Sequence, residues 1–139
     1  MLSTVEKVLF LKAIELFSQI TGEDLAPVAL IAAEETRESG EVIFAEGEAG
    51  DALYLVLDGR VRIDREEEVI AELGERECFG EMSILDGVPR SATATAIEDT
   101  NLLKIARDDF QEILSEKPEI ALGVIKVLSR RLRAASRQV

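Results

Sequence analysis

The sequence predicts a mainly β domain in which a sandwich or barrel of short strands is flanked by helices at both ends. Two patterns predict it. Short apolar runs between residues 42 and 105 are separated by turn signals. Helical spacing of apolar residues precedes and follows these runs. The length of 139 residues suits one core, so we expect a single domain over residues 1–139.

Residues 1–38 are predicted to form an N-terminal helical segment. Ser3 and Glu6 have capping-box spacing at the start of a first helix. Residues 21–24 interrupt that helix. We expect a second helix over about residues 25–35, with Pro27 in its first turn.

Residues 39–106 are predicted to form the β region. Turn signals at residues 47–50, 58–59, 74 and 86–87 divide it into strands. Residues 92–96 alternate with period two, as a half-buried strand should. The expected strands are residues 42–44, 53–57, 61–63, 69–73, 92–97 and 102–105.

Residues 107–139 are predicted to form C-terminal helices. A short helix should end near Lys117, and Pro118 suits the first turn of a last helix that runs to about Arg137. Arginines crowd the end of that helix, where they suit its dipole. Its apolar stripe is first of all core packing, and dimerisation through it is a further hypothesis. The stripe consists of Ala121, Ile125, Leu128, Leu132 and Ala135.

Composition excludes several classes of function. The formal net charge of −12 makes nucleic acid a poor partner, since its binding requires neutralisation of phosphates. The chain has no histidine and one cysteine, Cys78, which excludes His-based catalysis, His-ligated zinc or haem and Cys-based metal sites. We therefore expect no metal and no cofactor, and no enzymatic activity because the sequence shows no pair of nucleophile and base. No apolar run approaches the roughly 20 residues of a membrane span, and no signal peptide opens the chain. We expect a cytoplasmic protein.

Residues 79–93 carry the chemistry. A glycine followed by a very short helix presents backbone N–H groups that favour an anion, and Arg90 can add a bidentate contact to phosphate oxygens. Ser91 adds a hydroxyl and another N–H. Glu81 beside an anion needs a donor of its own, and a ribose hydroxyl is such a donor. The short loop favours one phosphate, and no Walker lysine motif suggests ATP hydrolysis. The segment therefore predicts a nucleotide site.

Phe79-Gly80-Glu81 followed by residues 89–93, Pro-Arg-Ser-Ala-Thr, resembles the phosphate-binding cassette of the cyclic nucleotide-binding domains. This is the family of cAMP receptor proteins and kinase regulatory subunits. The resemblance extends upstream through residues 40–43, 46–48, 50–51, 53–54 and 58–61. It implies an eight-stranded jelly-roll-like barrel, a double-stranded β-helix, with N-terminal helices and a C-terminal lid helix.

The resemblance also assigns roles to residues. Arg90 would bind the cyclic phosphate and Glu81 the ribose 2′-hydroxyl. Arg131 aligns with a base-contacting arginine in the last helix of a bacterial member of the family, whereas Ala135 replaces a threonine there. The candidate ligand-binding residues are Gly80, Glu81, Met82, Ser83, Arg90, Ser91, Ala92, Ile63, Ile70 and Arg131.

Two functions from different classes follow. The first is a regulatory module that binds a 3′,5′-cyclic nucleotide, cAMP in preference to cGMP, and passes the change through the C-terminal helix to an effector domain or protein outside this chain. The second is a structural or dimerising module whose pocket is unused. Ser91, directly after the arginine, occurs with either base in the family, so the preference for cAMP is a hypothesis.

Overall fold

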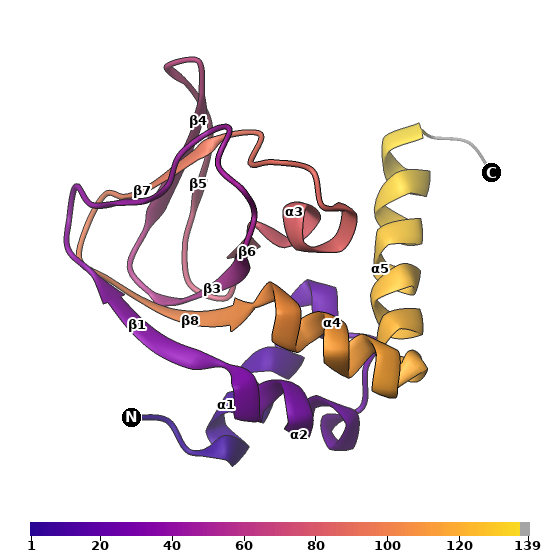
Figure 1. Ribbon diagram of the computed structural model, residues 1–139. Coiled ribbons are helices and arrows are strands. Elements are labelled where there is room, and N and C mark those ends of the chain that lie inside the picture. The colour runs from indigo at the N-terminus through magenta and orange to yellow at the C-terminus, as the bar shows by residue number, and fades with distance from the viewer. Residues whose placement is uncertain (137–139) are drawn as a thin grey trace. The chain divides into compact units, whose positions relative to one another are not determined.

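A computed structural model describes residues 1–136 and divides the chain into two compact units. The barrel unit comprises residues 32–108, and the helical unit comprises residues 1–31 with the segment from Asp109 onward. Figure 1 labels the elements of both. Arg137, expected near the end of the last helix, lies outside the described residues.

The barrel unit is built from two antiparallel four-stranded sheets (Figure 1). The strand orders are β1-β8-β3-β6 and β2-β7-β4-β5. This confirms the expected fold of two β layers with flanking helices. The strands are β1 (Ala33–Arg37), β2 (Val42–Phe44), β3 (Ala52–Asp58), β4 (Val61–Arg65), β5 (Glu68–Leu73), β6 (Cys78–Phe79), β7 (Thr93–Ala96) and β8 (Thr100–Ala106).

Apolar side chains from both sheets form one core within the barrel unit. Small residues on β7 allow the sheets to approach, and aromatic residues fill the end of the core beside the pocket described below. The buried members are Ile43, Ala52, Tyr54, Val56, Val61, Phe79, Ala94, Ala96 and Leu102.

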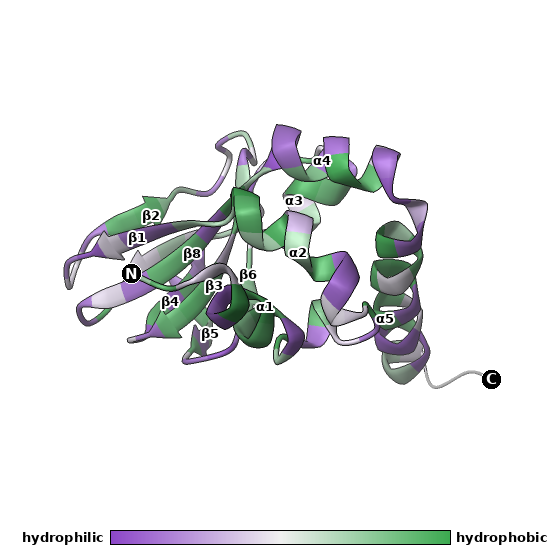
Figure 2. Ribbon diagram, turned by 90° about the horizontal axis from the view of Figure 1, so that it is seen from below, coloured by the Kyte–Doolittle hydropathy of each residue, from purple (hydrophilic) through white to green (hydrophobic). Residues whose placement is uncertain are grey.

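The order of the helices is as expected, but the apolar stripe expected to pack in the core from the last helix does not do so. Its members Ile125 and Leu132 are exposed, and the buried residues of that helix are Ile120, Gly123, Val124 and Val127. Ser3 and Glu6 form the expected capping box, with reciprocal hydrogen bonds of 3.1 and 3.0 Å. Figure 2 shows hydrophobic and hydrophilic residues on the turns of α5. The helices are α1 (Thr4–Lys12), η1 (Glu15–Phe17, a 3₁₀ helix), α2 (Gly22–Ile31), α3 (Glu81–Asp86), α4 (Arg107–Glu116) and α5 (Pro118–Ser136).

The expected second helix over residues 25–35 is wrong at both ends. It begins at Gly22, because the Thr21 hydroxyl accepts a hydrogen bond from the Asp24 N–H and caps the helix. Pro27 consequently lies inside α2 rather than in its first turn. Residues 33–37 form a strand because they pair with β8, from Ala33 opposite Lys104 to Arg37 opposite Thr100. Long-range pairing there overrides the local helix propensity of alanine and glutamate.

Candidate functional site

A pocket of about 200 Å³ opens within the barrel unit. It lies where β6, α3 and the segment before β7 meet. Its wall combines the cassette with apolar residues of β2 and β4. The lining residues are Phe44, Ile63, Cys78, Phe79, Gly80, Glu81, Met82, Ser83, Arg90, Ser91 and Ala92.

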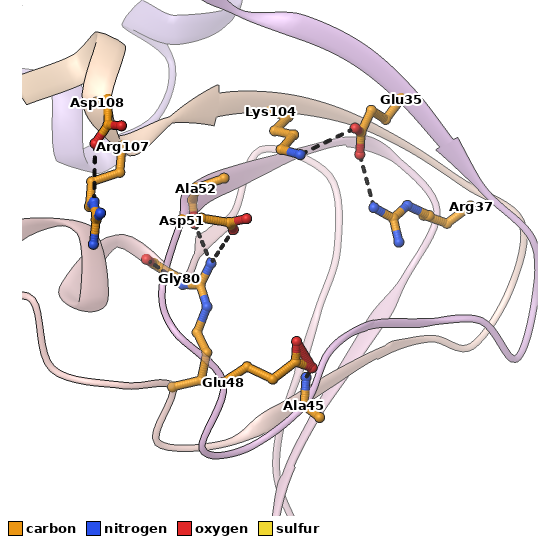
Figure 3. A network of polar contacts seen from close by, with 11 residues as sticks. Glu35, Arg37, Ala45, Glu48, Asp51, Ala52, Gly80, Lys104, Arg107 and Asp108 are labelled. Carbon is orange, nitrogen blue, oxygen red and sulfur yellow. Dashed lines mark hydrogen bonds and ion pairs between the residues drawn. The ribbon is translucent and has the colours of Figure 1, made fainter.

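Arg90 is the buried cation of this pocket. The residue is 3% exposed, and its Nη1 donates a hydrogen bond of 2.8 Å to the carbonyl oxygen of Gly80. Its Nη2 donates to the carbonyl oxygen of Ala52 and lies 3.9 Å from the exposed carboxylate of Asp51. Figure 3 shows Asp51, Ala52 and Gly80 gathered in one place. The hydrogen-bond acceptors of the Arg90 guanidinium are thus two neutral carbonyls, and its ion pair with Asp51 is long.

The environment of the Arg90 guanidinium also affects its protonation. Burial lowers the pKa of Arg90 from its ordinary value, and the nearby groups Tyr54, Asp51, Glu48 and Glu81 only partly oppose that effect. The Nε atom is buried and has no hydrogen-bond partner. A buried donor without an acceptor is costly, so an acceptor that reached this atom would stabilise the guanidinium.

Aromatic rings pack against one face of the Arg90 guanidinium. The Cζ atom of Arg90 lies 4.0 Å from the centre of the Phe44 ring, which is a cation–π distance. Phe44 contacts Phe79 at 5.8 Å between ring centres, and Phe79 stacks on Tyr54 at 5.3 Å. These rings restrict the rotamers of Arg90 and exclude water from one of its sides.

The backbone of Arg90 is held by a different loop. The N–H of Gly47 donates 2.8 Å to the Arg90 carbonyl, and the N–H of Arg90 donates 2.8 Å to the Glu48 carbonyl. Gly47 has a φ of +90°, which glycine adopts without strain. The Glu48 side chain closes the loop by accepting a 2.6 Å hydrogen bond from the N–H of Ala45 (Figure 3). The upstream segment 46–48 thus positions the arginine of the cassette.

Gly80 combines two requirements. It caps α3 in the left-handed conformation, with a φ of +82°, and a Cβ there would lie 2.6 Å from Nη1 of Arg90. A larger residue would therefore displace the guanidinium. Gly50 allows a second close approach, because a Cβ there would lie 2.1 Å from the Cβ of Ser83 in α3.

Glu81 begins α3, lines the same pocket as Arg90 and is half-buried. Its charge is among those that raise the pKa of Arg90, so the two side chains interact electrostatically. Among the other predicted site residues, Met82 and Ser91 are exposed at the pocket, whereas Ser83 and Ala92 are buried. Ile63 lines the pocket from β4. The structure thus gathers eight of the ten candidates around one pocket: Gly80, Glu81, Met82, Ser83, Arg90, Ser91, Ala92 and Ile63.

Two candidates lie elsewhere, and their roles stay predictions. Ile70 is 50% exposed on β5 and is not a lining residue. Arg131 belongs to the helical unit, where its Nε donates 2.8 Å to the Glu15 carboxylate. It lines a separate hollow of that unit with Ser18 and Val127.

The sequence does not identify several residues that contribute to the site. Phe44 and the Ala52 carbonyl contact Arg90 directly, although they lie about 40 residues before it. The only available signal was their position in or beside segments that carry the family resemblance. A main-chain carbonyl has no residue-type signature, so no pattern could have identified Ala52.

Two negative findings concern residues 1–136. No group of three or more His, Cys, Asp or Glu side chains in this range could hold a metal ion. None of the helices described there has the length and apolar character of a membrane span.

The comparisons with known proteins agree with this geometry. Residues 34–117 match the cyclic nucleotide-binding domain family. The cyclic AMP receptor protein of Thermus thermophilus is 46% identical over 101 residues, which cover 69% of this chain and 47% of that protein. The chain thus spans about half the length of this curated relative.

Solved structures show the same fold. The N-terminal domain of a transcriptional regulator from Streptomyces coelicolor A3(2) superposes with a TM-score of 0.83 at 33% identity, covering 94% of this chain and 96% of that one. The regulatory domain of Toxoplasma gondii PKA, crystallised with cAMP, has a TM-score of 0.74 at 31% identity over 78% of this chain and 44% of that one. Because the family match covers more than half of the chain and includes the whole pocket, this protein belongs to the cyclic nucleotide-binding domain family.

Proposed function

We propose that residues 1–139 act as one regulatory domain that binds a 3′,5′-cyclic nucleotide, with cAMP preferred to cGMP. The observation that carries the proposal is Arg90, a buried guanidinium at a pocket with an unpartnered Nε. A cyclic phosphate would supply both the acceptor and the negative charge that this cation lacks.

Glu81 supplies the second recognition element. In a 3′,5′-cyclic nucleotide the 2′-hydroxyl is the only ribose hydroxyl that remains a donor. A carboxylate at the start of α3, on the wall of the same pocket, can accept from it. One cation for a phosphate and one carboxylate for a sugar hydroxyl match a single nucleotide with one phosphate.

The preference for cAMP rests on the relatives. One is named as a cyclic AMP receptor protein, and another was crystallised with cAMP. Ser91 occurs at a position compatible with either base, so it does not decide the preference.

We propose that nucleotide binding changes the position of α5 and that this change transmits the signal. The α5 side chains Leu122, Ile125 and Leu132 are each more than half exposed, so an apolar part of the helix is available to a second surface. A nucleotide shifts the position of this helix only by its differential affinity for the two arrangements. Dimerisation through α5, or contact with an effector, would use the same residues, and Arg131 would serve the base. We expect neither catalysis nor nucleic-acid binding from this chain.

Titration calorimetry with cAMP, cGMP and 5′-AMP tests the proposal. We expect cAMP to bind most tightly and 5′-AMP least, because the open phosphate carries additional charge and lacks the cyclic geometry. A ligand that binds only the folded state also raises the melting temperature. If none of the three nucleotides produces heat or a thermal shift, the pocket is unused and the chain is a structural or dimerising module.

Hydrogen exchange tests the coupling. We expect cAMP to protect residues 79–93 and also residues 118–136. Protection of the cassette with unchanged exchange along α5 would leave nucleotide binding intact and disprove the coupling.

A further inference from the structure

Arg65, the last residue of β4, contacts the cassette from outside the pocket. Its Nε donates a hydrogen bond of 2.8 Å to the carbonyl oxygen of Ser91, the residue that follows Arg90. Arg65 is not among the residues that line the pocket, whereas Ser91 and Ala92 are. The proposed phosphate site therefore has a side-chain support from a neighbouring strand.

The hydrogen bond from Arg65 to Ser91 lies just beyond the end of the ladder between β4 and β7. The last residues paired between β4 and β7 are Asp64 and Thr93. Two steps further, a continued ladder would place Glu66 opposite Ser91 and give the Ser91 carbonyl a backbone donor. The chain turns instead, because Glu66 and Glu67 have φ values of 52° and 68°. The side chain of Arg65 thus takes the place of the missing ladder donor.

A second contact fixes the turn. The N–H of Glu66 donates 3.3 Å to the carboxylate of Glu46, whose own N–H donates 3.0 Å to the hydroxyl of Thr93. Glu46 therefore joins the hairpin of β4 and β5 to the strand that follows the cassette. This connection holds the hairpin end, and with it Arg65, beside Ser91.

The bond to Ser91 determines the direction of the next N–H. The Ser91 carbonyl and the Ala92 N–H belong to one peptide group, which is planar and trans. When the carbonyl faces Arg65, the N–H faces the opposite way. Ala92 is 7% exposed and lines the pocket, so a fixed N–H there is a preorganised donor for an anion.

We propose that Arg65 is a positioning residue for the phosphate site, which orients the Ser91–Ala92 peptide so that the Ala92 N–H donates to one exocyclic oxygen of the cyclic phosphate. The inference rests on the proposed function. Arg65 contributes through this peptide rather than by touching the ligand.

Three variants test it. Arg65→Met retains the alkyl chain and removes the donor, and Arg65→Lys restores a donor without the guanidinium. Arg62→Met is the matched control, since Arg62 lies on the same strand and its nearest ion pair is with Asp64, at 3.8 Å. We expect Arg65→Met to weaken cAMP binding about threefold to tenfold, Arg65→Lys to recover part of the loss, and Arg62→Met to bind like wild type.

A readout specific for one phosphate oxygen separates positioning from a general loss of structure. The two phosphorothioate diastereomers of cAMP each replace one exocyclic oxygen by sulfur, a poorer acceptor. We expect the ratio of their affinities to shrink in Arg65→Met and to be retained in Arg62→Met. General loosening of the barrel would weaken both diastereomers equally and leave the ratio unchanged.

The outcomes distinguish this inference from the proposed function. Absence of cAMP binding by the wild-type chain would overturn both. If wild type binds while Arg65→Met shows the same affinity and diastereomer ratio as Arg62→Met, only the role of Arg65 is disproved. Equal weakening of both diastereomers in a folded Arg65→Met would also disprove it.

Discussion

The barrel unit and the helical unit differ in charge. Residues 32–108 contain 20 Asp and Glu against 8 Lys and Arg, whereas the other 62 residues contain 8 of each. The whole net charge of −12 therefore belongs to the unit that contains the proposed anion pocket. An attractive field over the surface cannot be what recruits a phosphate there. Recognition has to come from a few donors at short range, above all the buried Arg90.

Replacement of that single cation should have the largest effect. We expect Arg90→Ala to weaken cAMP binding about tenfold to a hundredfold, because a charge-assisted contact contributes roughly 1.5–3 kcal/mol. Arg133→Ala removes an equal charge from the helical unit and should change affinity little. Calorimetry on both variants checks this expectation. Equal losses would mean that total charge, rather than the local site, controls binding.

Arg90→Ala should also lower stability, since it removes the donors to the carbonyls of Gly80 and Ala52. Affinity is therefore measured at temperatures where circular dichroism shows a folded protein. Arg90→Lys keeps the charge and loses the planar fork, so it should fall between wild type and Arg90→Ala.

Replacing one glycine in each unit by alanine compares how the free energy of unfolding of the two units responds to an added methyl group. In Gly50→Ala the new methyl group would collide with Ser83 of α3, and we expect a loss of about 1–3 kcal/mol together with weaker nucleotide binding. In Gly22→Ala the new methyl group would make ordinary contact with Val8 at 3.7 Å. That variant should be neutral or slightly stabilising because alanine favours helix. Urea unfolding measures both, and a stable Gly50→Ala would show that α3 can move away from β3.

One acidic residue of the barrel unit should help rather than hinder the ligand. We expect 2′-deoxy-cAMP to bind about tenfold more weakly than cAMP. The deoxy sugar lacks the 2′-hydroxyl, so the Glu81 carboxylate would have no donor from the ligand. The gap should narrow in Glu81→Gln and persist in Glu75→Gln, an exposed acid of the same unit. Competition binding with the two sugars is the measurement. Equal affinity of wild type for both would remove Glu81 from sugar recognition.

Of the changes considered, added salt should have the smallest effect on nucleotide affinity, and it should raise the affinity rather than lower it. The net field of the barrel unit repels an anion, and added salt screens that repulsion more than it screens a buried contact. Between 50 and 500 mM NaCl we expect affinity to stay constant or to rise by at most about threefold. A steep fall would show that long-range attraction dominates, contrary to the charge comparison.

The cassette could be predicted from the sequence because its chemistry lies in one short stretch. Gly80, Glu81 and Arg90 are close along the chain, and their residue types carry the information. The partners of Arg90 are different. Phe44, Gly47 and Ala52 come from β2, the following loop and β3, and two of them act through backbone atoms.

The same division applies to secondary structure. The sequence predicts the strands that have clear apolar runs, but it places β1 in a helix and has no pattern that indicates β6. β6 has two residues and exists through pairing with Tyr54 and Leu55 of β3. Neither strand has a local pattern strong enough to outweigh helix propensity or turn signals.

The sequence by itself determined the order of helices and strands, the cassette and the type of ligand to expect, because each depends on residue type and spacing along the chain. Tertiary structure alone decided which groups surround the cation. Burial left Arg90 with an unpartnered Nε, β1 formed through its pairing with β8, and Arg65 came to lie beside Ser91 where a ladder ended. These contacts join segments far apart in the sequence, since Ala33 and its partner Lys104 on β8 are separated by 71 residues. Such pairings depend on the whole fold, which no local pattern specifies.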